Sequence, residues 1–105
     1  MFKVTRTQSR PNARIDFWGE NHPLVSESIQ AYRKENYIDN GKFVSKTVEF
    51  STDGLYRTVV STWASMEALE EFLADPRIIA EFVTPGEQYM SENGIVTVSR
   101  SSEAI

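Results

Sequence analysis

The chain contains no cysteine, which excludes a disulfide framework, a thiolate metal site and a cysteine nucleophile. It has a single histidine, His22, so a histidine-rich metal site is excluded as well. Its five glycines are scattered singly, and no glycine-rich loop that could cradle a phosphate is present. From these absences we predict neither a metal site nor a cofactor.

Long apolar runs are missing too. The longest aliphatic run is Ile78-Ile79-Ala80, whereas a helix needs about 20 apolar residues to span a bilayer. Residues 1–14 carry basic side chains but no apolar stretch typical of a signal peptide. The chain has fewer basic than acidic residues, 11 Lys and Arg compared with 15 Asp and Glu. The resulting net charge of −4 disfavours nucleic-acid binding. We therefore expect a cytoplasmic protein with neither a membrane nor a nucleic-acid partner.

What is present suits one packed domain over residues 1–105. The chain is 40% hydrophobic and 11% aromatic, and a domain of this length buries about two thirds of its surface on folding. Residues 2–7 alternate apolar and polar side chains, which predicts a strand. From Pro23 the apolar spacing becomes helical and predicts a helix over residues 23–37, with the proline at its first position. Residues 8–22 stay unassigned.

The clearest local signal is Asp53-Gly54, a favoured two-residue hairpin turn between β-rich runs at 42–51 and 55–63. Pairing outward from this turn places Phe50 opposite Arg57, Val48 opposite Val59 and Val44 opposite Trp63. One face of the hairpin is then mostly apolar and should lie under helices, although it includes two cations. The other face carries Phe43, Tyr56 and Val60.

The second half of the chain predicts a helix, a short helical segment and a final strand. Ser65 suits the N-cap of a helix, and Asp75-Pro76 suits the start of a segment that runs to about Val83 and ends at Pro85-Gly86. Residues 95–99 form the last strand, and residues 101–105 are expected to be a loose tail. The order β-α-β-β-α-β predicts an α+β, ferredoxin-like fold: a four-stranded antiparallel sheet with helices on one face.

The run Ser61-Thr62-Trp63-Ala64-Ser65-Met66-Glu67-Ala68-Leu69 resembles a pattern of the dimeric α+β barrel superfamily, in which a strand ends in Trp before a Ser-capped helix. Within that superfamily the segment from Phe43 to Phe82 is most similar to antibiotic biosynthesis monooxygenase-like domains. The resemblance implies a homodimer, and an activity that ranges among members from cofactor-independent oxygenation to none known. Haem-degrading members carry a Trp and a His where this chain has Phe72 and Phe82, and an Asn where residues 2–7 have none. Haem degradation is therefore not expected.

Two residues are candidates for catalysis. His22 could act as a general base, since histidine is the residue type most often used for proton transfer near neutral pH, although we favour a loop role for it. Trp63 could contribute to a reaction, but we favour packing beneath the helix that follows it. The predicted ligand-binding residues, which should face the space between sheet and helices, are Trp18, Tyr32, Phe50, Arg57, Trp63, Phe72 and Phe82.

The two cations on the apolar face of the hairpin, Lys46 and Arg57, need an explanation because an unpaired buried charge is costly. Each must reach the rim, pair with an acid or meet an anionic ligand. We favour the rim for Arg57, since it lies close to the hairpin turn, and a ligand carboxylate is the alternative.

Three functional hypotheses follow. The one we favour is that a small hydrophobic, carboxylate-bearing (fatty-acid-like) ligand binds in a cavity between sheet and helices. The alternative is a cofactor-independent monooxygenase acting on an aromatic or polyketide-like molecule, and the third is a purely structural dimer with a filled core. In all three we expect a homodimer through the open sheet face, because Phe43, Tyr56 and Val60 make that face too apolar for comfortable exposure.

Overall fold

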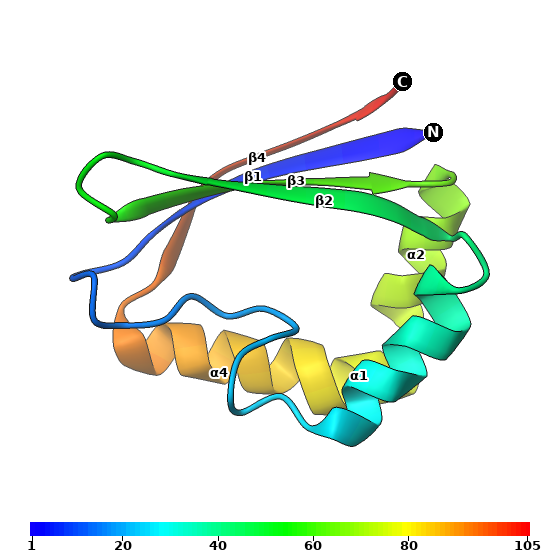
Figure 1. The fold of residues 1–105 in the computed structure, drawn as a ribbon, viewed down its shortest axis with the longest axis horizontal. Helices are drawn as coiled ribbons and strands as arrows, with labels where there is room; N and C mark the ends of the chain where they lie inside the picture. Colours follow the sequence, from blue (N-terminus) through cyan, green and yellow to red (C-terminus); the bar gives the residue numbers. More distant parts are fainter.

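The fold is a four-stranded antiparallel sheet covered on one face by helices, described by a computed structural model of residues 1–105 (Figure 1). The strand order is β2-β3-β1-β4. The strands are β1 (Phe2–Ser9), β2 (Phe43–Phe50), β3 (Tyr56–Trp63) and β4 (Val96–Ala104). The predicted ferredoxin-like α+β fold is confirmed.

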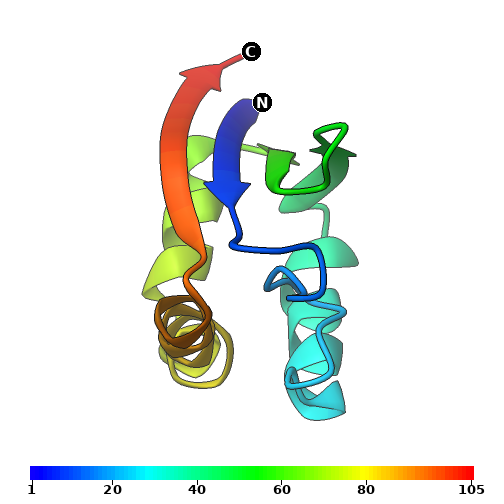
Figure 2. The ribbon, with the colours of Figure 1, turned by 90° about the vertical axis from the view of Figure 1, so that its left-hand side faces the viewer.

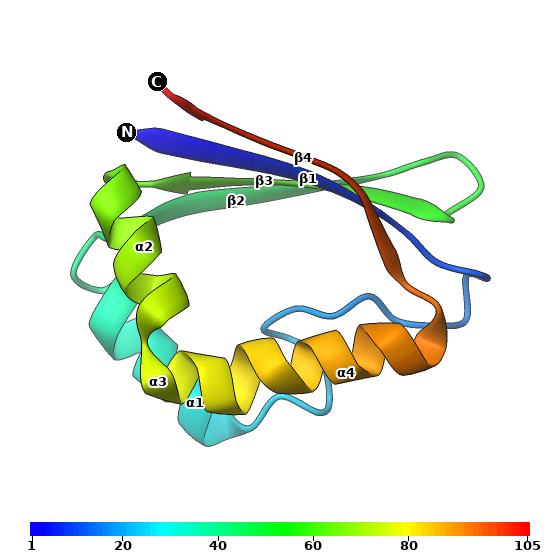
Figure 3. The same ribbon diagram turned by 180° about the vertical axis from the view of Figure 1, so that it is seen from behind.

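The helices lie on one side of the sheet. Helix α1 (Glu27–Arg33) continues into a π-helical turn, η1 (Lys34–Ile38), and α2 (Met66–Ala74) follows β3. After α2, the short α3 (Pro76–Ile78), the π-helical η2 (Ile79–Val83) and α4 (Thr84–Asn93) succeed one another without a break (Figure 3). Turned by 90°, the molecule shows α4 below β4 and α1 on the side of the hairpin, with the interior between them (Figure 2). None of these helices has the length and apolar content that crossing a membrane requires.

The first helix begins later than the sequence pattern predicts. It starts at Glu27 rather than at Pro23, because Ser26 has an extended backbone and its hydroxyl accepts a hydrogen bond from the Ile29 N–H at 3.2 Å. Leu24, one of the apolar residues whose spacing suggested a helix from Pro23, is largely exposed. The start of α1 is therefore determined by the Ser26 cap, which satisfies a free backbone amide, and not by Pro23.

The predicted helix end at Pro85-Gly86 is wrong. The N–H of Thr84 bonds to the carbonyl of Ile79 across the wider π-helical turn, and α4 starts again at Thr84. Pro85 therefore lies in the first turn of a new α-helical segment, where its missing N–H costs little. The helix ends at Gly94, which adopts the left-handed conformation with φ of 69°.

The loose tail predicted for residues 101–105 is also wrong. Strand β4 pairs with β1 as far as Phe2 opposite Ala104. Beyond that pair, Met1 and Ile105 exchange two hydrogen bonds of 3.0 and 2.8 Å, so the chain ends lie side by side (Figure 1). Every residue of β4 is exposed. Backbone pairing, together with an ion pair between Lys3 and Glu103, holds this edge strand. No buried face imposes alternation on its last residues, which explains why the sequence did not reveal them.

The hairpin confirms two of the three predicted pairs, Phe50 opposite Arg57 and Val48 opposite Val59. A β-bulge between Phe43 and Ser45 then shifts the register, so that Phe43, and not Val44, pairs with Trp63. The Phe43 ring packs edge-on against Trp63 with centroids 5.2 Å apart. Its prediction as an open-face residue is therefore wrong, since it packs against the core.

Candidate functional site

An internal space lies between the sheet and the helices and consists of two adjoining chambers of about 410 and about 110 Å³. We call these two chambers the inner cavity. The two chambers share eight lining residues, contributed by β1, β3, the β1–α1 loop and the helices: Arg6, Gln8, Trp18, Ser61, Trp63, Phe72, Phe82 and Met90. Four of these eight side chains are aromatic, and the polar ones come from the sheet.

A third space, which we call the outer basin, measures about 500 Å³ and is lined mainly by the loop between β1 and α1. It shares Gly19, Glu20, Lys46 and Arg57 with the smaller chamber. His22 and Phe50 also line it. The outer basin thus adjoins the inner cavity at the position of Arg57.

The loop between β1 and α1, which the sequence left unassigned, folds back under the sheet. The Arg10 guanidinium ties it to the hairpin by donating to the Gly54 carbonyl at 2.8 Å and to the Ile15 carbonyl at 2.7 Å. Phe17 is buried, and its ring lies between the guanidiniums of Arg10 and Arg57, 4.6 and 4.7 Å from its centroid. Sequence reasoning missed Phe17, and periodicity could not find it because the loop is irregular.

Trp18, the next residue, packs against helix α4 at Gly86. A Cβ atom at Gly86 would lie 2.4 Å from Trp18 Nε1, so only glycine leaves room for the indole. The Trp18 ring also packs against Phe82 and Tyr89, with centroids 6.0 and 5.6 Å away. The glycine that looked like a helix breaker in the sequence is therefore the place where the loop meets the helix.

Arg57 is buried, with 7% of its surface exposed, so the predicted rim position is wrong. The β1–α1 loop covers it. Its Nη2 donates to the side-chain oxygen of Gln8 and, at 2.9 Å, to the backbone carbonyl of Trp18, while Nε has no hydrogen-bond partner. Burial, and secondarily the charge of Arg6, lower the pKa of Arg57 to about 10. Neutral oxygens thus stabilise this cation and leave its charge uncompensated.

Lys46, the other cation on the apolar face, pairs with an acid. Its Nζ lies 2.8 Å from Glu20 Oε2, and both side chains are about one-quarter exposed. Burial raises the pKa of Glu20, but the hydrogen bond from Lys46 and the other favourable contacts outweigh it, so the net pKa lies below its usual value. Lys46 is therefore neutralised within the protein.

Arg6 is a cavity residue that sequence reasoning also missed. It lines both chambers, yet its side chain makes no hydrogen bond or ion pair. In the β1–β4 register it stands opposite Arg100, and burial together with the Arg100 charge lowers the pKa of Arg6. The signal was present in the alternation that places Phe2, Val4 and Arg6 on one face of the strand.

His22 is buried and packs against the rings of Tyr89 and Trp18, with centroids 4.5 and 4.9 Å away. Its Nδ1 accepts a hydrogen bond from the Leu24 N–H at 3.1 Å. The lone pair of Nδ1 is thus engaged, and in neutral His22 the proton is carried by Nε2. A role as general base for His22 remains a prediction.

The structure brings together most of the side chains predicted to bind a ligand. Trp18, Trp63, Phe72 and Phe82 all line the inner cavity, and Arg57 lies where it adjoins the outer basin. Trp63, the second catalytic candidate, packs against Phe72 at 5.1 Å and its indole N–H is 3.4 Å from the Ser61 hydroxyl.

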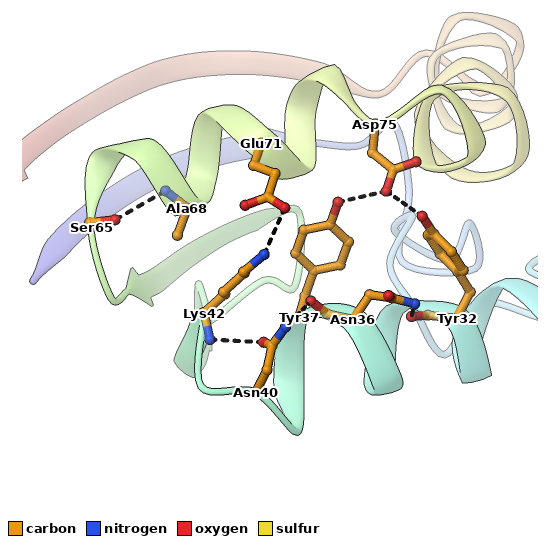
Figure 4. Close-up of polar contacts among 9 residues, drawn as sticks. All are labelled: Tyr32, Asn36, Tyr37, Asn40, Lys42, Ser65, Ala68, Glu71 and Asp75. Atoms are coloured by element: carbon orange, nitrogen blue, oxygen red, sulfur yellow. Dashed lines mark hydrogen bonds and ion pairs between the residues drawn. The ribbon is translucent and has the colours of Figure 1, made fainter.

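Two predicted residues lie elsewhere. Phe50 is 58% exposed and borders only the outer basin. Tyr32 lines neither chamber nor basin. Its hydroxyl donates to Asp75 Oδ2 at 2.6 Å, and the Tyr37 hydroxyl donates to the same oxygen at the same distance (Figure 4). These two bonds connect the first helix to the α2–α3 junction.

No three His, Asp or Glu side chains come together as a metal site would require.

No protein-family model matches the chain, and no curated protein matches it in sequence. Solved structures do match it in fold. An antibiotic biosynthesis monooxygenase-like protein from Deinococcus radiodurans has a TM-score of 0.58 at 12% identity, over 100% of this chain and 92% of the other. SnoaB, a cofactor-independent oxygenase from Streptomyces nogalater, has a TM-score of 0.60 at 14% identity, over 99% and 91%.

The chain has the fold of these monooxygenase-like proteins. A dimeric ferredoxin-like protein from an uncultured marine organism shares it as well, with a TM-score of 0.53 at 10% identity over 99% of this chain and 95% of the other. The predicted resemblance in fold is therefore confirmed over nearly the whole chain.

Proposed function

We propose that the protein binds a small apolar acid in the inner cavity, in the cytoplasm. One observation carries the proposal: cations gather around a space walled by aromatic rings. Six of the 11 Lys and Arg in the chain line the two chambers or the outer basin, but only three of the 15 Asp and Glu do so. The six cations are Arg6, Arg10, Arg33, Lys46, Arg57 and Arg100, and the three acids are Asp16, Glu20 and Glu87. An anion with an apolar body suits this combination.

The size of the space supports a ligand of this class. The larger chamber, of about 410 Å³, falls within the usual range of small-molecule sites, about 300–1,000 Å³. Its apolar lining extends beyond the shared aromatic residues to Leu69, Leu73 and Val83. The adjoining smaller chamber adds about 110 Å³ to this space.

Decanoate and decan-1-ol form a matched pair of probes for the test, because they differ mainly in charge. Both tryptophans of the chain line the inner cavity, so ligand binding should change the intrinsic fluorescence. We expect decanoate to bind at least about tenfold more tightly than the alcohol, because a charge-assisted hydrogen bond contributes about 1.5–3 kcal/mol. Equal affinities, or no binding of either probe, would refute the proposal.

A second candidate function is cofactor-independent oxygenation of an aromatic or polyketide-like molecule. The five aromatic side chains of the inner cavity and the fold shared with SnoaB favour it. Without a cofactor, the electrons must come from the substrate: a ring CH₂ group loses a proton to form a carbanion, and reaction with O₂ then yields a ketone and water. The cations that line the cavity would stabilise that carbanion.

An anthrone, whose ring CH₂ is acidic, is a suitable probe for oxygenation. We expect one O₂ to be consumed for each quinone formed, at a rate above that in buffer, as measured with an oxygen electrode and by absorbance. A rate equal to that in buffer would remove this candidate and leave ligand binding intact.

We further propose that the protein is a homodimer joined through the open sheet face. Tyr56, Val60 and several threonines occupy that face, and Tyr56 is 46% exposed. The dimeric ferredoxin-like protein of the same fold supports this arrangement. A two-fold axis would let one patch serve both subunits.

A further inference from the structure

Resting on the proposed function, we infer that Arg6, with Arg100 beside it, binds the acid group of the ligand, and that Arg57 is a positioning residue. The sequence alone pointed to Arg57. The structure divides the two tasks between different arginines.

Arg57 already has structural partners. It bonds to Gln8 and to the Trp18 carbonyl, and its guanidinium lies against the Phe17 ring. These contacts join β3 to β1 and to the β1–α1 loop. Their loss would release the loop that carries Trp18, which forms part of the cavity wall.

Arg6 has no such partners. Its side chain makes no hydrogen bond, no ion pair and no contact over an aromatic ring, although it lines both chambers. A half-buried guanidinium with five free donors is suited to a planar carboxylate, which it can bind through two parallel bonds.

Arg100 adds a second unpaired cation. It is directly opposite Arg6 in the β1–β4 register, lines the larger chamber and makes no ion pair. Like charges directly opposite one another in a sheet are destabilising. An anion between the two guanidiniums would be attracted by both and would offset their repulsion. Packing gives no reason for two arginines at these positions, whereas anion binding does.

The location of Arg6 specifies the pose of the ligand. Its acid group would lie on the sheet side, where the two chambers meet. Its apolar body would extend through the larger chamber towards Leu69 and Val83 on the helices. The preferred ligand is therefore a monoacid with one charged end and an unbranched or flat apolar body.

Three variants test the inference: Arg6→Gln, Arg57→Gln and, as a control, Lys42→Gln, whose cation pairs with Glu71 outside the cavity. For each we would measure decanoate and decan-1-ol binding by tryptophan fluorescence, together with the melting temperature. We expect Arg6→Gln to lose about tenfold or more in decanoate affinity, to keep decan-1-ol affinity, and to melt no lower than wild type because a repulsion is removed. Arg57→Gln should lower the melting temperature and weaken both probes alike, and Lys42→Gln should keep the wild-type preference.

The outcomes separate the two proposals. If wild type prefers decanoate and Arg6→Gln keeps that preference, the inference is wrong and the proposed function stands. A selective loss of decanoate binding in Arg57→Gln alone would return the anchoring role to Arg57. If wild type binds neither probe, both proposals fail.

Discussion

At the scale of single residues, the interior of this protein accommodates a buried cation without a carboxylate. Neutral carbonyl oxygens from Gln8 and Trp18 accept from Arg57, and the Phe17 ring lies against its guanidinium. Such partners satisfy donors but leave the positive charge in place. Under the proposed function, this uncompensated charge would attract an anionic ligand, whereas the charge of Lys46 is neutralised by Glu20.

Trp63 allows a test of packing against catalysis. It is buried between Phe43 and Phe72, so Trp63→Ala should lower the free energy of unfolding by about 3–5 kcal/mol. Trp63→Phe should lose less, because a ring is kept at the end of the strand. Urea denaturation followed by circular dichroism measures both, and an unshifted midpoint for Trp63→Ala would contradict the packing role.

Asp75 predicts a pH dependence of stability. Burial raises its pKa, but bonds from Tyr32, Tyr37 and two backbone amides outweigh burial, and the net pKa lies below the ordinary 3.8 (Figure 4). A lowered carboxyl pKa stabilises the fold above the unfolded value and loses that effect as pH falls through the folded value. The stability of wild type should therefore decline below about pH 4.

The variant Asp75→Asn isolates this contribution. It should lower the free energy of unfolding by about 1–2 kcal/mol at pH 7, because a neutral amide accepts the two tyrosine hydrogen bonds less strongly than the carboxylate does. The cap of α3 should be kept, since asparagine caps helices as well as aspartate does. Its denaturation midpoint should vary less with pH than that of wild type below pH 4. Asp39→Asn, which alters an exposed ion pair with Lys34, is the matched control. A pH profile for Asp75→Asn that runs parallel to wild type would exclude the role of the carboxylate.

At the scale of elements, the sequence predicted those whose signal is local. The Asp53-Gly54 turn determined the hairpin register up to Ser45, and Ser65 marked the start of α2. The bulge at Phe43–Ser45 was invisible, because an inserted residue changes the pairing without changing the composition. Only the first part of β4 was predicted, because its side chains are all exposed and no buried face imposes alternation on its last residues.

The candidate site was predicted in part for the same reason. Trp18, Trp63, Phe72 and Phe82 were recognisable as interior aromatic residues, and the structure brings them together. The closure of the β1–α1 loop over Arg57 depends on contacts between residues far apart in sequence, such as Arg10 with Gly54. No periodicity within the loop encodes those contacts.

Helix α4 supplies a prediction of its own. Alanine favours helices over glycine by about 1 kcal/mol, yet Gly86→Ala should destabilise the protein by about 1–3 kcal/mol, because the new Cβ would meet the Trp18 indole at 2.4 Å. Thermal unfolding measures the difference. Ser91→Ala, an exposed position on the same helix, should be neutral or slightly stabilising. A Gly86→Ala variant as stable as wild type would show that Trp18 can move aside.

At the scale of the whole molecule, the sheet has two different faces. One is covered by helices, and the other presents Tyr56, Val60, Thr5, Thr7 and Thr58 without a covering element (Figure 1). Thr7 and Thr58 share a 3.0 Å hydrogen bond across the strands. A face of mixed character such as this suits the centre of a protein interface.

The proposed dimer is tested by a charge on this face. Tyr56→Glu should place two like charges near the two-fold axis and shift the protein towards monomer, as measured by sedimentation equilibrium. Gln88→Glu, which adds the same charge on the exposed surface of α4, is the control and should stay dimeric. Wild-type protein that sediments as a monomer at tens of micromolar would contradict the dimer itself.

The uneven distribution of charge around the cavity has a kinetic consequence. The protein as a whole carries a net charge of −4. If this charge were spread evenly over the surface, it would repel an anion, and added salt would screen the repulsion and speed up association. Here the cations are concentrated around the cavity and the outer basin, so the local field attracts anions while the rest of the surface repels them. Stopped-flow tryptophan fluorescence should therefore show decanoate associating more slowly as ionic strength rises, and decan-1-ol at an unchanged rate. Capture of an acid by this negatively charged protein would thus depend on the direction from which it approaches.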